Sequence, residues 1–159
     1  MNIEILCVGK IKEKFYVDAI AEYKKRLSKY CKIKIIEVSD EKTVENASIN
    51  LENTIKAKEG EKILKILNES SYIIALTIDG KSFSSIEFSK EIESLGIKGY
   101  SSITFIIGGS IGLSENVIKK ADMKLSFSKF TFPHQLMRVI LLEQIYRSYK
   151  IIKNEPYHK

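Results

Sequence analysis

The sequence predicts an α/β fold built on a mostly parallel β-sheet that is flanked by helices. Apolar stretches of strand length alternate five times with stretches that have the spacing of amphipathic helices, and this alternation is typical of parallel sheets. No internal repeat, low-complexity segment or linker interrupts the pattern. We therefore expect residues 1–159 to form a single domain, which is an ordinary length for one hydrophobic core.

The first half of the chain contains three expected strands and two expected helices. Apolar runs place the strands at residues 3–9, 32–38 and 72–78. The third run stops at Asp79-Gly80, a pair that is typical of turns. A helix is expected over residues 14–30, because four apolar residues share one face: Tyr16, Ile20, Tyr23 and Leu27. The second helix, over residues 51–67, mixes Leu and Ile with many Lys and Glu, as in an exposed amphipathic helix.

The second half contains three further helices and two further strands. Ser84 and Glu87 match a capping box, so a helix is expected from Ser84 to Leu95. Ser114 can cap a short helix that ends near Ala121. Pro133 suits the first turn of the last helix, because its fixed φ fits there and its missing N–H is not needed. That helix should end near residue 152, and strands are expected at residues 103–107 and 123–127.

Composition excludes several classes of protein. No run of about 18 apolar residues exists, so a membrane-spanning helix is not expected. The N-terminus has no basic region of the kind that opens a signal peptide, and we expect a cytoplasmic protein. The two cysteines and two histidines show no metal-ligand spacing, so we expect reduced thiols and no metal site.

The net charge of +6 is concentrated at the C-terminal end. From Lys124 onward there are seven basic residues and only two acidic ones, Glu143 and Glu155, which leaves an excess of +5. Such a local excess suits a polyanionic partner such as RNA. It suits a solvated basic face equally well.

A glycine-rich segment, Gly108-Gly109-Ser110-Ile111-Gly112, follows the fourth expected strand and precedes a helix, as in many ligand sites of α/β folds. A P-loop is excluded, because Leu113-Ser114 stands where a Lys-Ser or Lys-Thr pair is required. A dinucleotide site would need glycine in place of Ile107 and an acidic residue about 20 positions later. A ligand site of another kind and a tight turn without a ligand both remain open.

The same segment is part of a family resemblance. Residues 105–114 resemble the cofactor loop of the SPOUT, or α/β-knot, methyltransferases. Residues 125–138 and 145–147 and the ending Asn154-Glu155-Pro156-Tyr157-His158-Lys159 are similar to one family of that class, the ribosomal RNA large subunit methyltransferase H family. So is the N-terminal Val8-Gly9-Lys10. The resemblance covers the whole chain.

The resemblance implies a fold and an activity. Members of this family methylate N3 of a pseudouridine in large-subunit ribosomal RNA on the ribosome, use S-adenosylmethionine and act as homodimers. Their fold contains a trefoil knot near the C-terminus, a rare exception to unknotted topology. Carried over by position, the cofactor contacts are Leu76, Gly108, Phe127, Ser128, Lys129, Phe130, Thr131 and Phe132.

Each expected cofactor contact has a physical reason. Leu76 offers an apolar wall, and Gly108 lets a ligand approach its main chain. The irregular backbone of residues 127–132 offers N–H and C=O groups that can read an adenine edge. The aromatic residues of this segment can cover the adenine ring, although core packing remains an alternative for Phe127 and Phe132.

The expected catalytic residues lie in the last helix and the tail. The N3 proton of the acceptor base must leave, which favours a histidine near the target base. His158 is the first choice and Tyr157 could stack or orient beside it, unless the tail is a frayed terminus. Arg138 is expected to meet substrate phosphate or the site, whereas His134 is given a structural role.

The last helix predicts a homodimer. Apolar residues nearly surround it between Leu136 and Ile152, which indicates burial against its own sheet on one side and against a partner subunit on the other. Arg138 and Arg147 lie on opposite faces, so they could serve one site only across a two-fold dimer. Arg147 could equally form an ordinary pair with Glu143. Two other functions stay open: an RNA-binding module that holds the cofactor without catalysis, and a nucleotide-dependent oxidoreductase.

Overall fold

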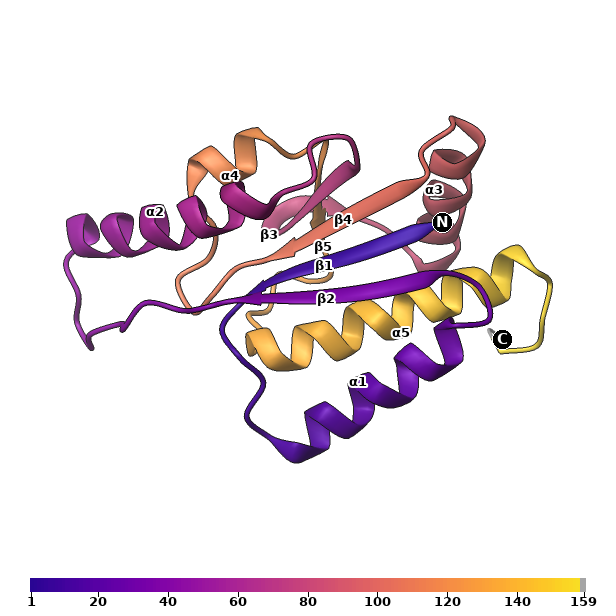
Figure 1. Ribbon diagram of the computed structural model, residues 1–159, viewed down its shortest axis with the longest axis horizontal. Coiled ribbons are helices and arrows are strands. Elements are labelled where there is room, and N and C mark those ends of the chain that lie inside the picture. Colours follow the sequence, from indigo (N-terminus) through magenta and orange to yellow (C-terminus); the bar gives the residue numbers. More distant parts are fainter. Residues whose placement is uncertain (158–159) are drawn as a thin grey trace.

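The structure, a computed structural model, describes residues 1–157 and has a parallel β-sheet at its centre. Its strands are β1 (Asn2–Val8), β2 (Lys32–Val38), β3 (Tyr72–Ser82), β4 (Ser102–Ile107) and β5 (Met123–Ser126). They lie in the order β2-β1-β4-β3-β5, and every neighbouring pair is parallel (Figure 1). All carboxyl ends therefore meet at one edge of the sheet.

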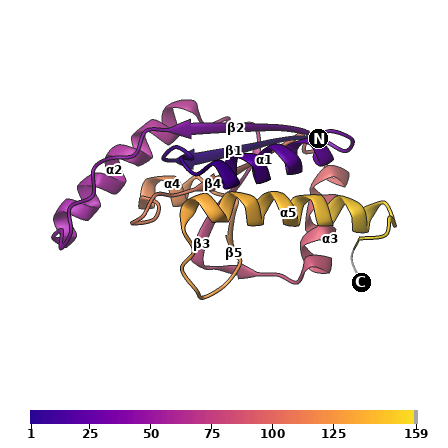
Figure 2. The same ribbon diagram turned by 90° about the horizontal axis from the view of Figure 1, so that it is seen from below.

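Helices cover both faces of the sheet. They are α1 (Lys14–Leu27), α2 (Ile49–Ile66), α3 (Ser85–Ile97), α4 (Glu115–Lys119) and α5 (His134–Ile152). Helices α1, α3 and α5 pack on one face and α2 and α4 on the other (Figures 1 and 2). This three-layer arrangement confirms the predicted α/β class with a parallel sheet.

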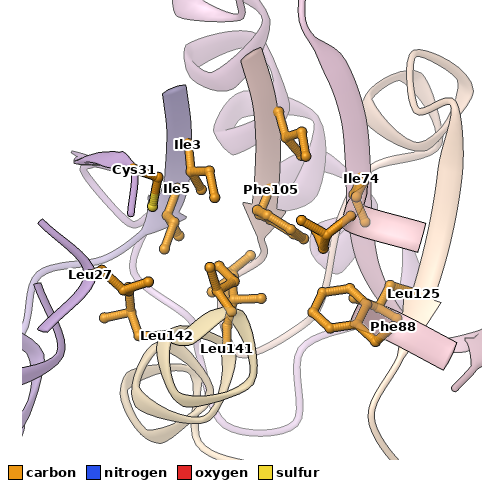
Figure 3. Packing of buried hydrophobic residues seen from close by; sticks show 14 of the residues in the cluster. Ile3, Ile5, Leu27, Cys31, Ile74, Phe88, Phe105, Leu125, Leu141 and Leu142 are labelled. Carbon is orange, nitrogen blue, oxygen red and sulfur yellow. The ribbon is translucent and has the colours of Figure 1, made fainter. Parts of the chain in front are cut away.

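The larger hydrophobic core lies between the sheet and α5. Leu141, Leu142 and Ile145 of α5 have no exposed surface, and the first two point toward Ile5 and Phe105 of the sheet (Figure 3). Burial of each such side chain contributes roughly 1.5–3 kcal/mol. The residues that alternate with Ile5 and Phe105, such as Leu6 and Ile106, face the smaller core under α2 and α4, so the strands are apolar on both faces.

All three helices begin where they were predicted, at Ser84, Ser114 and Pro133, although two of the caps differ in detail. The capping box is present: the Ser84 amide donates to the Glu87 carboxylate at 2.7 Å, and the Glu87 amide donates to the Ser84 hydroxyl at 3.2 Å. Ser114 is the N-cap of α4, but its hydroxyl makes no capping hydrogen bond among residues 1–157. Pro133 is the N-cap of α5 rather than a residue of its first turn.

Strand β3 does not stop at Asp79-Gly80 as predicted. Its pairing with β5 shifts between Leu76 and Lys81, so the chain bulges and then continues to Ser82. Gly80 allows this, because a Cβ there would lie 2.6 Å from the carbonyl carbon of Leu125 in β5. The glycine therefore marks a close approach between two backbones rather than the end of a strand.

Within residues 1–157, no helix is long and apolar enough to cross a lipid bilayer. Both cysteines are free and buried, and burial raises the pKa of the Cys7 thiol to about 12. A thiol of this kind stays protonated and unreactive near neutral pH.

Candidate cofactor site

A cavity of about 740 Å³ lies at the carboxyl edge of the sheet, where β3, β4 and β5 end. One wall is the glycine loop, residues 108–113, which follows β4. The bulge of β3, residues 77–79, forms another, and residues 127–134 close the site from β5 into the start of α5. The carboxyl edge of a parallel sheet is where α/β folds bind ligands, and the volume suits a cofactor-sized molecule.

The structure brings most of the predicted cofactor residues to this cavity. Its lining includes Leu76, Gly108, Phe127, Ser128, Phe130, Thr131 and Phe132. Lys129 is exposed and lies outside the lining. These segments are far apart in the chain and meet only because β3 lies between β4 and β5 in the sheet.

The glycine loop is both a tight turn and a cavity wall. The Gly112 amide donates to the Gly109 carbonyl at 3.1 Å, and Gly112 has a φ of +83°, which favours glycine. A Cβ at Gly108 would lie 2.8 Å from the carbonyl carbon of Gly112. The segment is therefore a tight turn that also forms part of the cavity wall.

The aromatic residues after β5 have different surroundings. Phe127 packs edge-on against Phe88 of α3, with ring centroids 6.4 Å apart, so part of its role is in the core. Phe130 is 78% exposed at the cavity and has no comparable packing. The Phe130 amide donates to the Ser128 hydroxyl at 3.0 Å, which holds the segment in a local turn.

Two lining residues titrate, Asp79 and His134. A hydrogen bond from Lys124, with Nζ 2.8 Å from the carboxylate, lowers the pKa of Asp79. Burial, followed by the charge of Arg138, lowers the pKa of His134. Near neutral pH the lining thus contains a neutral imidazole and a carboxylate whose charge is balanced by its ion pair with Lys124.

His134 lines the cavity, a position that was not predicted from the sequence. It was expected to be structural, but it lines the cavity and its Nε2 lies 3.1 Å from where a Cβ on Gly9 would be. Residues 77–79 were missed as well. Asp79 gave an indication, because a polar residue just after a strand of a parallel sheet falls on the ligand-binding edge.

We predict that His134 makes folding more sensitive to acid. Because its folded-state pKa is depressed, the stability that depends on neutral His134 is present above its ordinary pKa and is lost as pH falls through the folded-state value. Urea unfolding at pH 7 and pH 5 should therefore show a larger loss in the wild type than in His134→Asn. Equal losses in the two proteins would contradict the prediction.

Arg138 lies in the interior of the protein. Its side chain has no exposed area, and Nη1 lies 2.6 Å from the Glu37 carboxylate. Nη2 donates to the carbonyls of Gly9 at 2.6 Å and Val8 at 3.2 Å. In this conformation the guanidinium ties α5 to the ends of β1 and β2 and does not reach a phosphate on the surface.

Comparison with known proteins identifies the family of the chain. A family model described as "Predicted SPOUT methyltransferase" matches residues 1–158. The chain belongs to this family. Over all 159 residues it is 62% identical to ribosomal RNA large subunit methyltransferase H of Clostridium botulinum strain Kyoto, 58% identical to that of Clostridium acetobutylicum and 57% identical to that of Clostridium kluyveri. Each alignment covers the whole of both chains.

A solved structure agrees with this SPOUT methyltransferase in its fold. A putative methyltransferase of Legionella pneumophila, described in complex with the bound cofactor SAM, superimposes with a TM-score of 0.51 at 9% identity. The match covers 94% of this chain and 66% of that one. At this identity the likeness supports the fold alone.

The tail of this SPOUT methyltransferase lies away from its own cavity. Tyr157 donates a 3.3 Å hydrogen bond to Glu143, packs on Tyr146 and is covered by the guanidinium of Arg147. Tyr146 lies roughly 14 Å along α5 from Met137, the last helical residue that lines the cavity. In Figure 1 the segment that follows α5, up to residue 157, lies toward the edge of the sheet at which β1 begins. His158 lies outside the described residues.

Ion pairs with acidic residues elsewhere in the chain neutralise part of the positive charge of the C-terminal segment. Lys124 pairs with Asp79 and Arg138 with Glu37, both acidic residues from outside the segment. Arg147 forms the i,i+4 pair with Glu143 that was one of its two interpretations, and Lys150 pairs with Glu155. The local excess of charge therefore carries little of the argument for RNA. In the part of the chain that the structure describes, no group of three His, Cys, Asp or Glu is placed to hold a metal.

Proposed function

We propose that the protein transfers a methyl group from S-adenosylmethionine to N3 of a pseudouridine in large-subunit ribosomal RNA, acting on the assembled ribosome in the cytoplasm. The observation that carries the proposal is the cavity between the glycine loop and residues 127–134, in a SPOUT methyltransferase whose full-length relatives are named for this RNA. We also propose that the chain forms the trefoil knot that is expected from its resemblance to this family.

The residues around the cavity fit the cofactor. Leu76 and Phe127 present apolar surface that suits an adenine ring, and the loop backbones present N–H and C=O groups. Glycine at position 108 lets the loop close on itself beside the cavity, since a side chain there would meet Gly112. His134, which is neutral near pH 7 because burial lowers its pKa, adds no positive charge that would oppose a sulfonium.

The contribution of the chain is to bind and orient. The bound cofactor supplies an activated methyl group, so positioning of the acceptor nitrogen in line with that methyl provides much of the rate. Phe130, exposed at the cavity, is placed to stack on a base. His134 is within the lining and offers a neutral imidazole that could take a proton, a role first expected of His158.

The test of this function is methyl transfer to ribosomes. Purified protein and isotopically labelled S-adenosylmethionine are incubated with ribosomes from a strain that lacks the gene, and the ribosomal RNA is digested and analysed by mass spectrometry. We expect one labelled methyl group, on a pseudouridine, and no label on ribosomes from the parent strain. Absence of label on both kinds of ribosome would favour a binding module without catalysis.

We further propose a homodimer in which each tail serves the cavity of the partner. Within its own chain, Tyr157 packs on the far half of α5, away from the cavity. The outward face of α5 is only half-buried although it carries Leu136, Val139 and Ile140, as expected for a surface that a second copy covers. The location of the tail and this apolar face support the same arrangement.

Mixed dimers test the exchange of tails. One subunit carries Gly108→Val, which blocks its cavity, and the other carries Tyr157→Ala with His158→Ala, which disables its tail. If each tail acts at the cavity of the partner subunit, neither variant homodimer should be active. The mixed dimer should regain about half of the wild-type activity, because it has one site with an intact cavity from one subunit and an intact tail from the other. An inactive mixed dimer, or a monomer by sedimentation, would contradict this arrangement.

A further inference from the structure

Behind the glycine loop, on the side away from the cavity, lies the middle of α2. Two consecutive residues of this helix approach the loop: Glu59 lies beside Gly109, and Gly60 lies beside Ser114, the residue that follows the loop. Neither residue belongs to the cavity lining. Both residues therefore lie between the smaller core and the loop, where a buried carboxylate has no role in packing the core.

Glu59 is buried although its side chain is ionisable. Its side chain is 4% exposed, and burial raises its pKa. One carboxylate oxygen, Oε1, accepts the Glu41 amide at 2.9 Å. The other, Oε2, has no hydrogen-bond partner among residues 1–157 and lies 3.2 Å from where a Cβ on Gly109 would be. An unpartnered buried oxygen is costly, which indicates a role beyond packing.

Gly60 makes the matching contact at the other end of the loop. A Cβ on Gly60 would overlap the Ser114 hydroxyl, and it would also lie 3.3 Å from Val117 in α4. The Ser114 hydroxyl is itself buried and unpartnered within the described part of the chain. The absence of a side chain at Gly60 is therefore what lets α2 approach the end of the loop.

A second contact holds the same side of the loop. The hydroxyls of Thr43 and Ser110 share a hydrogen bond of 3.2 Å. The segment that carries Thr43 is fixed to α2, because Lys62 donates to the Glu41 carboxylate at 2.6 Å and to the Ser39 carbonyl at 2.9 Å. Helix α2 and this segment together support the loop from behind.

We propose that the Glu59–Gly60 step of α2 positions the glycine loop for cofactor binding, with Glu59 as a positioning residue that acts through the main chain of the loop. Glu59 Oε2 and the Ser114 hydroxyl, which have no hydrogen-bond partner among residues 1–157, lie beside that main chain. Their bulk limits how far the loop can move away from the cavity and toward α2. The inference rests on the proposed function, since the ligand of the cavity is taken to be S-adenosylmethionine.

The test is calorimetric titration of the full-length protein with S-adenosylhomocysteine, together with thermal melting and steady-state methyl transfer. Glu59→Ala should bind about tenfold more weakly and raise KM for S-adenosylmethionine more than it lowers kcat. Glu59→Gln, which keeps the shape and an acceptor oxygen, should recover most of the affinity. Glu61→Ala, an exposed carboxylate on the same helix, should bind like the wild type.

A second pair of substitutions separates an effect on cofactor binding from a loss of folding stability. Gly60→Ala should weaken binding by pushing on Ser114, and adding Ser114→Gly should restore part of the lost affinity. A Glu59→Ala protein with a lower melting temperature but an unchanged dissociation constant would overturn the proposal, as would the absence of restoration. If the wild-type protein itself fails to bind, the proposed function fails instead.

Discussion

Arg138→Ala is expected to lower the free energy of unfolding by about 3 kcal/mol, the largest stability effect that we predict for a single side chain. The substitution removes a wholly buried guanidinium and leaves the carbonyls of Val8 and Gly9 without their donor. Glu37 loses its ion pair but keeps the amide of Ile11 at 3.1 Å and partial contact with solvent, which places the loss at the lower end for buried pairs.

Urea unfolding followed by circular dichroism measures this effect. Arg138→Lys should recover only part of the stability, because an ammonium group cannot reproduce the forked contact with Glu37 and Gly9. Arg26→Ala is the matched control, since it removes an exposed arginine with an i,i+4 partner and should change stability by less than about 1 kcal/mol. An Arg138→Ala protein of wild-type stability that fails to methylate RNA would instead support the substrate role predicted from the sequence.

Gly108→Ala is expected to reduce affinity for S-adenosylmethionine by up to about a hundredfold, because forcing a methyl group against packed atoms costs about 1–3 kcal/mol and each 1.4 kcal/mol of binding free energy changes affinity about tenfold. The added methyl would meet the Gly112 carbonyl carbon at 2.8 Å, its oxygen at 2.9 Å and the Leu113 side chain at 3.1 Å. Most of these atoms belong to the backbone of the same tight turn, so the loop itself must shift into or away from the cavity.

Calorimetric titration with S-adenosylhomocysteine measures the loss, and hydrogen exchange checks that the sheet is intact. Gly96→Ala is the matched control: its Cβ would make an ordinary contact of 3.5 Å with Met1, and alanine in the helix α3 should be neutral or slightly stabilising. Wild-type affinity in Gly108→Ala would show that the glycine loop is not a wall of the cofactor site. It would also remove the main support for the proposed function.

The order of the elements could be predicted because it depends on local pattern. Apolar runs of strand length and helical spacing are properties of neighbouring residues, and β2 was predicted with its observed bounds. Strand β3 was predicted too short, because the pattern of turn residues is the same whether Gly80 ends a strand or lets two backbones touch. The second possibility depends on Leu125, which lies far away in the sequence.

The segments of the site could also be predicted, but not the contacts of each residue. The glycine loop and residues 127–132 are recognisable as strings, and the parallel sheet brings them to one edge. Their separate roles depended on packing, since Phe127 contacts the core whereas Phe130 is exposed. His134 entered the lining for the same reason, because α5 begins at the cavity.

The sequence by itself determined the α/β class, the alternation of strands and helices and the two loops that form the cavity. Only the tertiary structure decided that Arg138 is an interior ion pair, that Tyr157 lies away from its own cavity and that Glu59 lies behind the glycine loop. The physical reason is range. Class and loops follow from contacts between near neighbours, whereas Arg138 meets Glu37 across 101 positions, and no local pattern records which distant partner a buried charge will find.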